Sequence, residues 1–377
     1  MSATVTPLRE AEYFDTDSLR LLRNGLALSC HDGHWRLDTP AGPVRFAGSA
    51  DYVPPTLSRL VRAYTRDDEL VRVARLHDGG LAELREELGS RIVVPRRPPD
   101  DSARGVVLRY VRTQLAALAA ADLDVRQDRP DSVHRMRVAA RRLRGVFSAY
   151  APVLGGRKLL RELSSALRWL GGELAPARDV EVQWARARTW AGDRMDAYFA
   201  VLTEEAATRV RRALDSRRYV QLLNALDVLE VVLSEQPRRH WRKPARRPAT
   251  KVLPGLARAV AGHVDRRVAR VAARPAGPER DHAVHDVRKA AKRLRYALEA
   301  GAEALPVDAK PALRAFQDLL GEFQDAVVAG ELLSAMDGPD EAFAAARAAE
   351  AVAAARSVEA LPAAWHDLRE DLGPLWT

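Results

Sequence analysis

The chain has 377 residues and a mass of 41.6 kDa, enough for two or three domains. Hydrophobic residues make up 47% and charged residues 29%, which excludes wholesale disorder, and the single cysteine, Cys30, excludes a disulfide framework or a cysteine-rich zinc site. The 60 basic and 51 acidic residues leave a net charge of +9, all of it after residue 98, since residues 1–98 hold 14 of each sign. That excess favours a polyanionic partner.

No stretch approaches 18 consecutive apolar residues, and the N-terminus lacks the basic-then-apolar pattern of a signal peptide. We therefore expect a cytoplasmic protein that does not engage a membrane.

The first 95 residues have the pattern of a small α+β segment. Short strands are predicted at 27–30, 34–37 and 44–46, because turn-forming residues separate the apolar runs. An amphipathic helix is predicted from Pro54 to about Thr65, and a last strand at 91–94. A proline-rich linker follows at 96–101, where prolines exclude regular structure.

From Ser102 to residue 371 the pattern is helical, rich in Ala, Leu, Arg and Glu. A basic, proline-rich connector at 237–248 divides this domain into halves at about 102–236 and 249–371. The periodicity predicts helices at about 102–121, 131–151, 157–172, 177–187, 191–214, 216–234, 251–273, 279–304, 308–335, 338–356 and 358–371, with Gly171-Gly172 as a helix break.

The two halves repeat each other. Residues 133–144 and 284–295 are identical at eight of twelve positions without gaps, at an offset of 151. A second echo follows about 35 residues later in each half, Leu170-Gly171 then Arg178-Asp179 in the first and Leu320-Gly321 then Gln324-Asp325 in the second. Two ordered matches indicate an internal duplication and a pseudo-two-fold all-α domain.

On a helix, the repeated block places cations in a stripe beside the apolar face, not opposite it. The first stripe is His134, Arg137, Arg141 and Arg144, and the second is His285, Arg288, Lys292 and Arg295. Like charges at these spacings weaken an isolated helix. Their recurrence in both halves favours a binding site over a solvated basic face.

Cations spread over two helices need a partner with regularly spaced negative charges. One carboxylate or one phosphate cannot neutralise all of them. Inorganic polyphosphate, a nucleic acid or an anionic surface can. The histidines would strengthen binding when protonated.

The block His-x-x-Arg-x-x-x-(Lys/Arg)-Arg-Leu-Arg, present twice in an arginine-rich helical chain, resembles the CHAD family (conserved histidine α-helical domain) over about residues 101–371. The resemblance implies duplicated antiparallel helical bundles with pseudo-two-fold symmetry and basic faces lining a shared groove. It also implies polyphosphate as partner and location at polyphosphate granules, with granule-associated proteins as further partners. Carried over by motif, the implied contacts are His134, Arg137, Arg141, Arg142, Arg144, His285, Arg288, Lys289, Lys292, Arg293 and Arg295, with Arg109, Arg112, Lys251 and Arg258 as weaker candidates.

Two departures predict unequal halves. Val138 stands where the second block has Lys289, and Gln324 stands where the first half has Arg178, which predicts a lost ion pair. Asp179 and Asp325 are predicted to pair with a nearby arginine and orient it, not to act as catalytic carboxylates.

The N-terminal segment resembles the start of the CYTH family of triphosphate tunnel enzymes over about residues 10–80, on the run Tyr13 to Leu28. That family begins with a Glu-x-Glu-x-Lys strand, which we did not find here. Ser29 and Cys30 replace expected basic residues. We interpret the segment as a degenerate remnant without triphosphatase activity.

The sequence therefore predicts a non-enzymatic polyphosphate-binding protein with no metal and no cofactor. A nucleic-acid-binding or general polyanion-binding module is the first alternative, and a phosphoanhydride-processing enzyme is the second. Chain-length preference, oligomeric state and the role of the N-terminal segment stay open.

Overall fold

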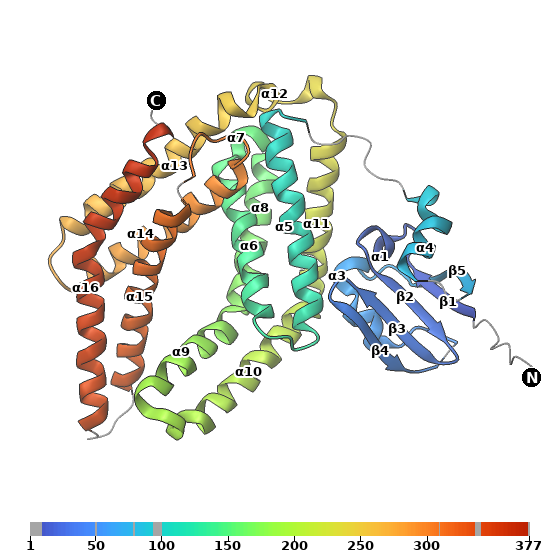
Figure 1. The fold of residues 1–377 in the computed structure, drawn as a ribbon, viewed down its shortest axis with the longest axis horizontal. Helices are drawn as coiled ribbons and strands as arrows, with labels where there is room; N and C mark the ends of the chain where they lie inside the picture. The colour runs from blue at the N-terminus through green and yellow to red at the C-terminus, as the bar shows by residue number, and fades with distance from the viewer. Residues whose placement is uncertain are drawn as a thin grey trace, which may run out of the picture.

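The computed structural model describes residues 10–49, 51–77, 80–92, 100–308, 310–335 and 341–375. The N-terminal unit is a five-stranded sheet in the order β4-β3-β2-β1-β5 with every neighbouring pair antiparallel (Figure 1). Its elements in chain order are β1 (Glu10–Asp15), α1 (Arg20–Arg23), β2 (Ala27–His31), β3 (His34–Thr39), β4 (Gly42–Ala47), α2 (Pro55–Leu60), α3 (Arg62–Thr65), β5 (Val71–His77) and α4 (Leu81–Leu88).

The three predicted strands are present as β2, β3 and β4, but β1, which lies between β2 and β5, and the edge strand β5 were not predicted. Both carry charged residues on their exposed positions, and β1 buries Tyr13 and Asp15. The predicted helix from Pro54 to Thr65 is two short helices, α2 and α3. The predicted strand at 91–94 is wrong at Arg91, which lies in a 3-10 turn, while 93–94 fall outside the described residues.

The rest of the chain is helical. The first half contains α5 (Ala103–Val125), α6 (Ser132–Ala149), α7 (Ala151–Leu154), α8 (Arg157–Glu173), α9 (Ala175–Ala191), α10 (Asp196–Leu214) and α11 (Arg217–Glu235). After the short α12 (Lys243–Arg246), the second half contains α13 (Ala249–Ala272), α14 (Pro278–Gly301), α15 (Lys310–Ala335) and α16 (Glu341–Asp371). No described helix has both the length and the apolar character needed to cross a membrane.

Two helix boundaries differ from the sequence prediction. The helices predicted at 338–356 and 358–371 are one helix, α16, which accommodates Pro362 in its interior. The break predicted at Gly171-Gly172 is also wrong, because α8 runs through both glycines to Glu173. The interruption follows at Leu174, ahead of Pro176, whose ring fits the first turn of α9.

The repeated helices α6 and α14 pack on each other through positions that the duplication makes equivalent. Gly145 and Tyr296 are 151 residues apart, and a Cβ on Gly145 would lie 2.7 Å from the Tyr296 ring. Tyr150 and Gly301 are also 151 apart, and a Cβ on Gly301 would lie 2.8 Å from the Tyr150 hydroxyl. Each half thus supplies one glycine and one tyrosine, so the helices approach closely at the pseudo-two-fold axis.

The N-terminal unit packs on the first helical half. One hydrophobic cluster includes Leu57 and Tyr64 from α2 and α3 together with Val107 and Leu226 from α5 and α11. Asp227 of α11 accepts hydrogen bonds from Arg20 and Arg66 of the N-terminal unit. Shared burial and charge pairing hold the two parts together.

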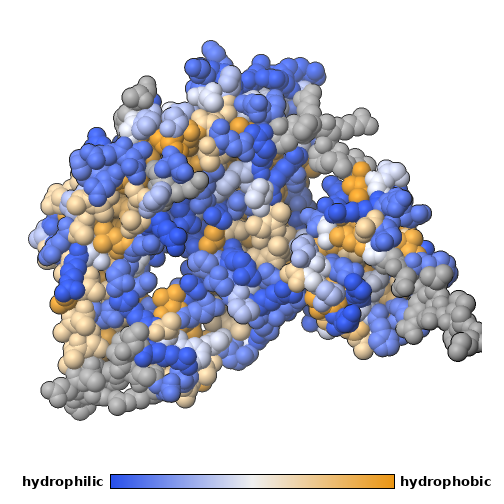
Figure 2. Space-filling view, viewed as in Figure 1, coloured by the Kyte–Doolittle hydropathy of each residue, from blue (hydrophilic) through white to orange (hydrophobic). Residues whose placement is uncertain are grey.

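The helical halves meet at two places and leave an opening between them (Figure 1). They meet around the α6–α14 contact, where α5 also contacts α13 and α14, and again where α9 reaches α15 and α16. At the second place Arg186 of α9 makes ion pairs with Glu322 of α15 and Glu350 of α16. The background shows through between these contacts in the space-filling view (Figure 2).

The close approach at Gly145 predicts a stability effect. Gly145→Ala should destabilise the fold by about 1–3 kcal/mol, because the new methyl group would overlap a buried tyrosine. Gly255→Ala in α13 is the matched control, since nothing lies within 4 Å of its Cβ position; it should stabilise by about 0.5–1 kcal/mol. Chemical denaturation measures both, and equal effects would contradict the close packing of α6 on α14.

Candidate anion-binding site

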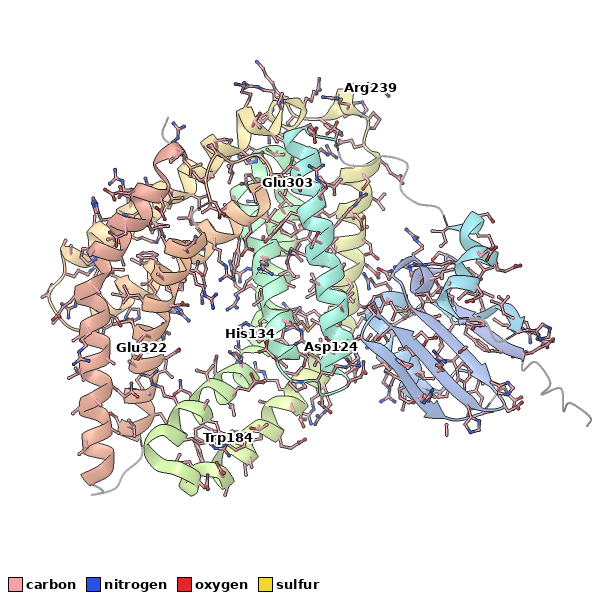
Figure 3. The ribbon with its side chains drawn as sticks, viewed as in Figure 1. Asp124, His134, Trp184, Arg239, Glu303 and Glu322 are labelled. Atoms are coloured by element: carbon pink, nitrogen blue, oxygen red, sulfur yellow. The ribbon has the colours of Figure 1, made fainter. Side chains whose placement is uncertain are left out.

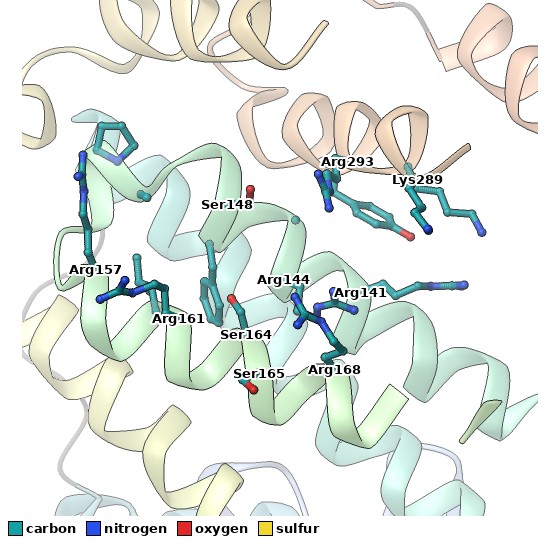
Figure 4. A pocket seen from close by; sticks show the side chains of 17 residues that line it. Arg141, Arg144, Ser148, Arg157, Arg161, Ser164, Ser165, Arg168, Lys289 and Arg293 are labelled. Carbon is teal, nitrogen blue, oxygen red and sulfur yellow. The ribbon is translucent and has the colours of Figure 1, made fainter. Parts of the chain in front are cut away.

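Eight basic residues line a cavity of about 1150 Å³ between α6, α8 and α14. Figure 4 shows basic side chains from the three helices directed into one space, with Arg141, Arg144 and Arg168 close together. No carboxylate from the part of the chain that the structure describes lines the cavity. Its eight cationic residues are Arg141, Arg144, Arg157, Arg161, Arg168, Lys289, Lys292 and Arg293.

These cations have almost no counter-ions within the described part of the chain. Of the eight, only Lys289 makes an ion pair there, with Asp286 at 3.4 Å. The Nε of Arg141 is buried and has no hydrogen-bond partner among the described residues. A buried polar group without a partner is costly, so the cavity is poised to accept an anion.

Burial and repulsion by neighbouring cations both act on Lys292. Burial, followed by the charges of Arg288, Arg141 and Arg137, lowers the pKa of Lys292 to about 7. Burial is also the main cause that lowers the pKa of Arg144, and Arg168 and Arg293 add to it. An anion bound in the cavity would raise the pKa of Lys292 back towards its usual range, because it would offset the surrounding positive charge.

The two predicted histidines occupy equivalent positions with different neighbours. Burial lowers the pKa of His134, and the nearby charge of Arg178 lowers it further. In the second half, Gln324 replaces that arginine and accepts a hydrogen bond from Nδ1 of His285. His134 lies at the start of α6 beside α9, on the side of the opening that faces Glu322 (Figure 3).

The two echoed aspartates lie near the arginines of the stripes. Asp179 is 3.6 Å from Nη1 of Arg137. Arg137 also donates to the backbone carbonyls of Leu174 and Ala175, which stabilises the junction of α8 and α9. In the second half, the charges of Arg288 and Asp325 oppose the effect of burial on each other's pKa.

Not every predicted contact lies in the cavity. Arg142 and Arg295 face the other side of the α6–α14 contact, where both pair with Glu299. The basic cavity is not lined by the other stripe residues, His134, Arg137, His285 and Arg288. The charges of Arg137 and Arg288 nevertheless lie near enough to lower the pKa of Lys292.

The weaker candidates lie outside the cavity too. Arg109 pairs with Glu303, and Arg112 pairs with Glu230. Lys251 and Arg258 are exposed on α13.

Sequence reasoning missed the contribution of α8. Arg157, Arg161 and Arg168 are spaced at i, i+4 and i+11, which puts them on one helical face with Ser164 between them. The first two stand at the helix N-terminus, where the dipole disfavours cations. The signal was therefore present, but it lies outside the repeated block.

The N-terminal unit holds a separate polar cavity of about 840 Å³. Strand β1 carries Glu10 and Glu12, which match the two glutamates of the Glu-x-Glu-x-Lys pattern, and Phe14 stands in the place of its lysine. Arg72 and Arg75 of β5 pair with Glu12, and the hydrogen bond from Arg75 is the main cause that lowers the pKa of this glutamate. The resemblance to the CYTH family stays a prediction.

Comparison with known proteins identifies the helical part. Residues 109–334 match the protein family described as the CHAD domain. The chain is similar to the crystal structure of the CHAD domain from the plant Ricinus communis, with a TM-score of 0.58 and 24% identity over 72% of this chain and 93% of that one. It is also similar to PptA from Streptomyces chartreusis, with a TM-score of 0.55 and 21% identity over 72% of this chain and 100% of that one. The predicted CHAD-like helical fold is confirmed.

Two uncharacterized proteins of Mycobacterium tuberculosis, from strains CDC 1551 and H37Rv, are each 28% identical over 441 aligned positions. The alignments cover 86% of this chain and 81% of each relative. They extend beyond the residues matched by the family.

The repulsion at Lys292 predicts a stability cost. Lys292→Met should stabilise the free protein by about 1–4 kcal/mol near pH 8, because it removes a cation whose pKa falls to about 7 in the fold. In the wild type, the unfolded state binds more protons than the fold between pH 7 and about 10, so stability should rise with pH across that window. Denaturation at several pH values checks this. A variant that keeps the wild-type slope would contradict the shift.

Proposed function

Because this chain belongs to the CHAD domain family, we propose that it binds inorganic polyphosphate through the cavity between α6, α8 and α14, without catalysing a reaction. CHAD domains are associated with polyphosphate binding. The single observation that supports the proposal most is the cavity lining, in which the described residues include eight cationic side chains and no carboxylate.

The distribution of the cations favours an extended polyanion over a single phosphate. Arg157 and Arg168 mark the two ends of the basic face of α8, about 16 Å apart at the rise of an α-helix. Arg141 and Lys292 continue the basic surface towards the opening between the halves. One phosphate could contact a few of these groups, whereas a linear chain of phosphates could contact them in succession and release its counter-ions.

The aromatic residues of the cavity argue against nucleic acid. Its two aromatic residues, Phe147 and Tyr296, are 2% and 3% exposed. Neither offers a free ring face on which a base could stack, which is the usual platform in single-strand binding. Inorganic polyphosphate has no bases to stack, so its binding does not require an exposed aromatic ring.

Binding to a long polymer also provides a means of localisation. One polyphosphate chain can hold many protein molecules, so a protein with this cavity would accumulate on polyphosphate granules. We therefore extend the proposal to granule association, in which proteins on the granule surface are further partners.

The proposal predicts a mutational pattern. Arg141→Ala combined with Lys292→Ala should weaken binding of long-chain polyphosphate at least tenfold at pH 7, because both cations line the cavity and each repeat helix loses one of them. The slope of log affinity against log salt should fall by about one to two. Arg135→Ala is the control, since Arg135 pairs with Asp124 outside the cavity. Equal losses in the two proteins, measured by titration at several salt concentrations, would refute the site.

The reach of α8 predicts dependence on polymer length. Arg157→Ala with Arg161→Ala should weaken binding of long chains several-fold and leave tripolyphosphate almost unaffected. The short probe can satisfy its charges at Arg141 and Lys292, away from the start of α8. Parallel titrations with both polymers test this. Equal losses for both lengths would place the short probe at the start of α8 instead.

A further inference from the structure

A second cavity, of about 840 Å³, lies on the other side of the α6–α14 contact, between α5, α14 and α15. It is the counterpart of the basic cavity under the pseudo-two-fold symmetry. Five residues of each cavity correspond at the offset of 151, giving the pairs Arg293 and Arg142, Arg144 and Arg295, Phe147 and Leu298, Ser148 and Glu299, and Ala151 and Ala302.

The duplicated cavities differ in charge. The second is lined by three arginines, Arg142, Arg295 and Arg314, and by three carboxylates, Glu299, Asp308 and Asp318. Asp308 and Asp318 are exposed at its edge, and Asp318 lies 3.9 Å from Arg314. Glu299 instead pairs with both Arg142 and Arg295. Its position in the repeat is equivalent to that of Ser148 in the basic cavity.

The contacts of Glu299 are those of a bound anion. Its Oε2 accepts hydrogen bonds from Nε of Arg142 and from the Tyr110 hydroxyl, both at 2.8 Å. Its Oε1 accepts a hydrogen bond from Nη2 of Arg142 at 3.2 Å and lies 3.1 Å from Nε of Arg295. Two guanidinium groups and a hydroxyl therefore surround one carboxylate, an arrangement that also suits a phosphate group.

We propose that Glu299 is an internal anion that occupies a second, pseudo-symmetric phosphate-binding site, and that removal of its carboxylate opens this site to polyanions. The inference rests on the proposed function of the first cavity. In the wild type, Glu299 offsets one of the two positive charges of Arg142 and Arg295 and occupies the position between them that a phosphate group would take. The protein therefore presents one polyanion track, on the α8 side, although the duplication built two cavities.

The test uses the full chain with the first cavity weakened by Arg141→Ala and Arg168→Ala. In that background, Glu299→Ser introduces the residue of the equivalent position and should raise tripolyphosphate affinity at least tenfold in calorimetric titration. Adding Arg142→Ala should abolish the gain. Glu303→Gln is the matched control, since it removes one negative charge from a residue paired with Arg109 outside both cavities, and it should change affinity less than twofold.

Glu299→Gln, which keeps the size of the side chain, covers the case in which the serine variant does not fold, as judged by circular dichroism and thermal melting. A folded Glu299 variant without a gain, or a gain that persists with Arg142→Ala, would overturn the inference. Wild-type titrations separate the two claims. If the wild type binds polyphosphate and the Glu299 variants gain nothing, only the second site fails; if the wild type does not bind, the proposed function fails.

Discussion

Positive charge that the chain does not neutralise is the constraint on which the site depends. Most of the basic residues elsewhere that approach the core have carboxylate or carbonyl partners, such as Arg126 with Asp122 or Arg104 with the carbonyls of α11. In the cavity between α6, α8 and α14, only Lys289 has such a partner among the described residues. Burial and the charges of neighbouring arginines lower the pKa of Lys292 to about 7, so the protonated form of this lysine is held at a cost in free energy. An external anion would relieve it, which is why the charge is the strongest argument for a binding function.

The fold must hold these charges together against their repulsion. The contact of α6 and α14 does so through two glycine–tyrosine pairs that let the helices approach at the axis. Hydrophobic clusters on both sides of the contact bury Leu143 and Leu294, each of which stands between two arginines in sequence. Helices α6 and α14 thus supply both the buried apolar surface and many of the cations. Burial of that surface offsets the free-energy cost of holding the cations close together.

The sequence was informative where local periodicity determines structure. The duplicated block located α6 and α14 and placed Arg141, Arg144 and Lys292 beside the apolar face. Helical periodicity left Arg142 out of the cationic stripe, and in the structure Arg142 lines the other cavity, whereas transfer by motif counted it among the contacts. Its partner Glu299 lies 157 residues away, so only the tertiary structure reveals why it faces another cavity. The arginines of α8 were missed because they lie outside the repeated block. Strand β1 was missed because charged residues obscure its alternation of buried and exposed positions.

The account is tested most directly by titrating long-chain polyphosphate into the full chain at near-physiological salt, with excess duplex DNA as competitor. A cavity lined by eight cations without an accessible aromatic ring should bind polyphosphate tightly, and the binding should survive the DNA. Binding that DNA abolishes would reduce the cavity to a general polyanion surface. Failure to bind polyphosphate at all would contradict the central claim.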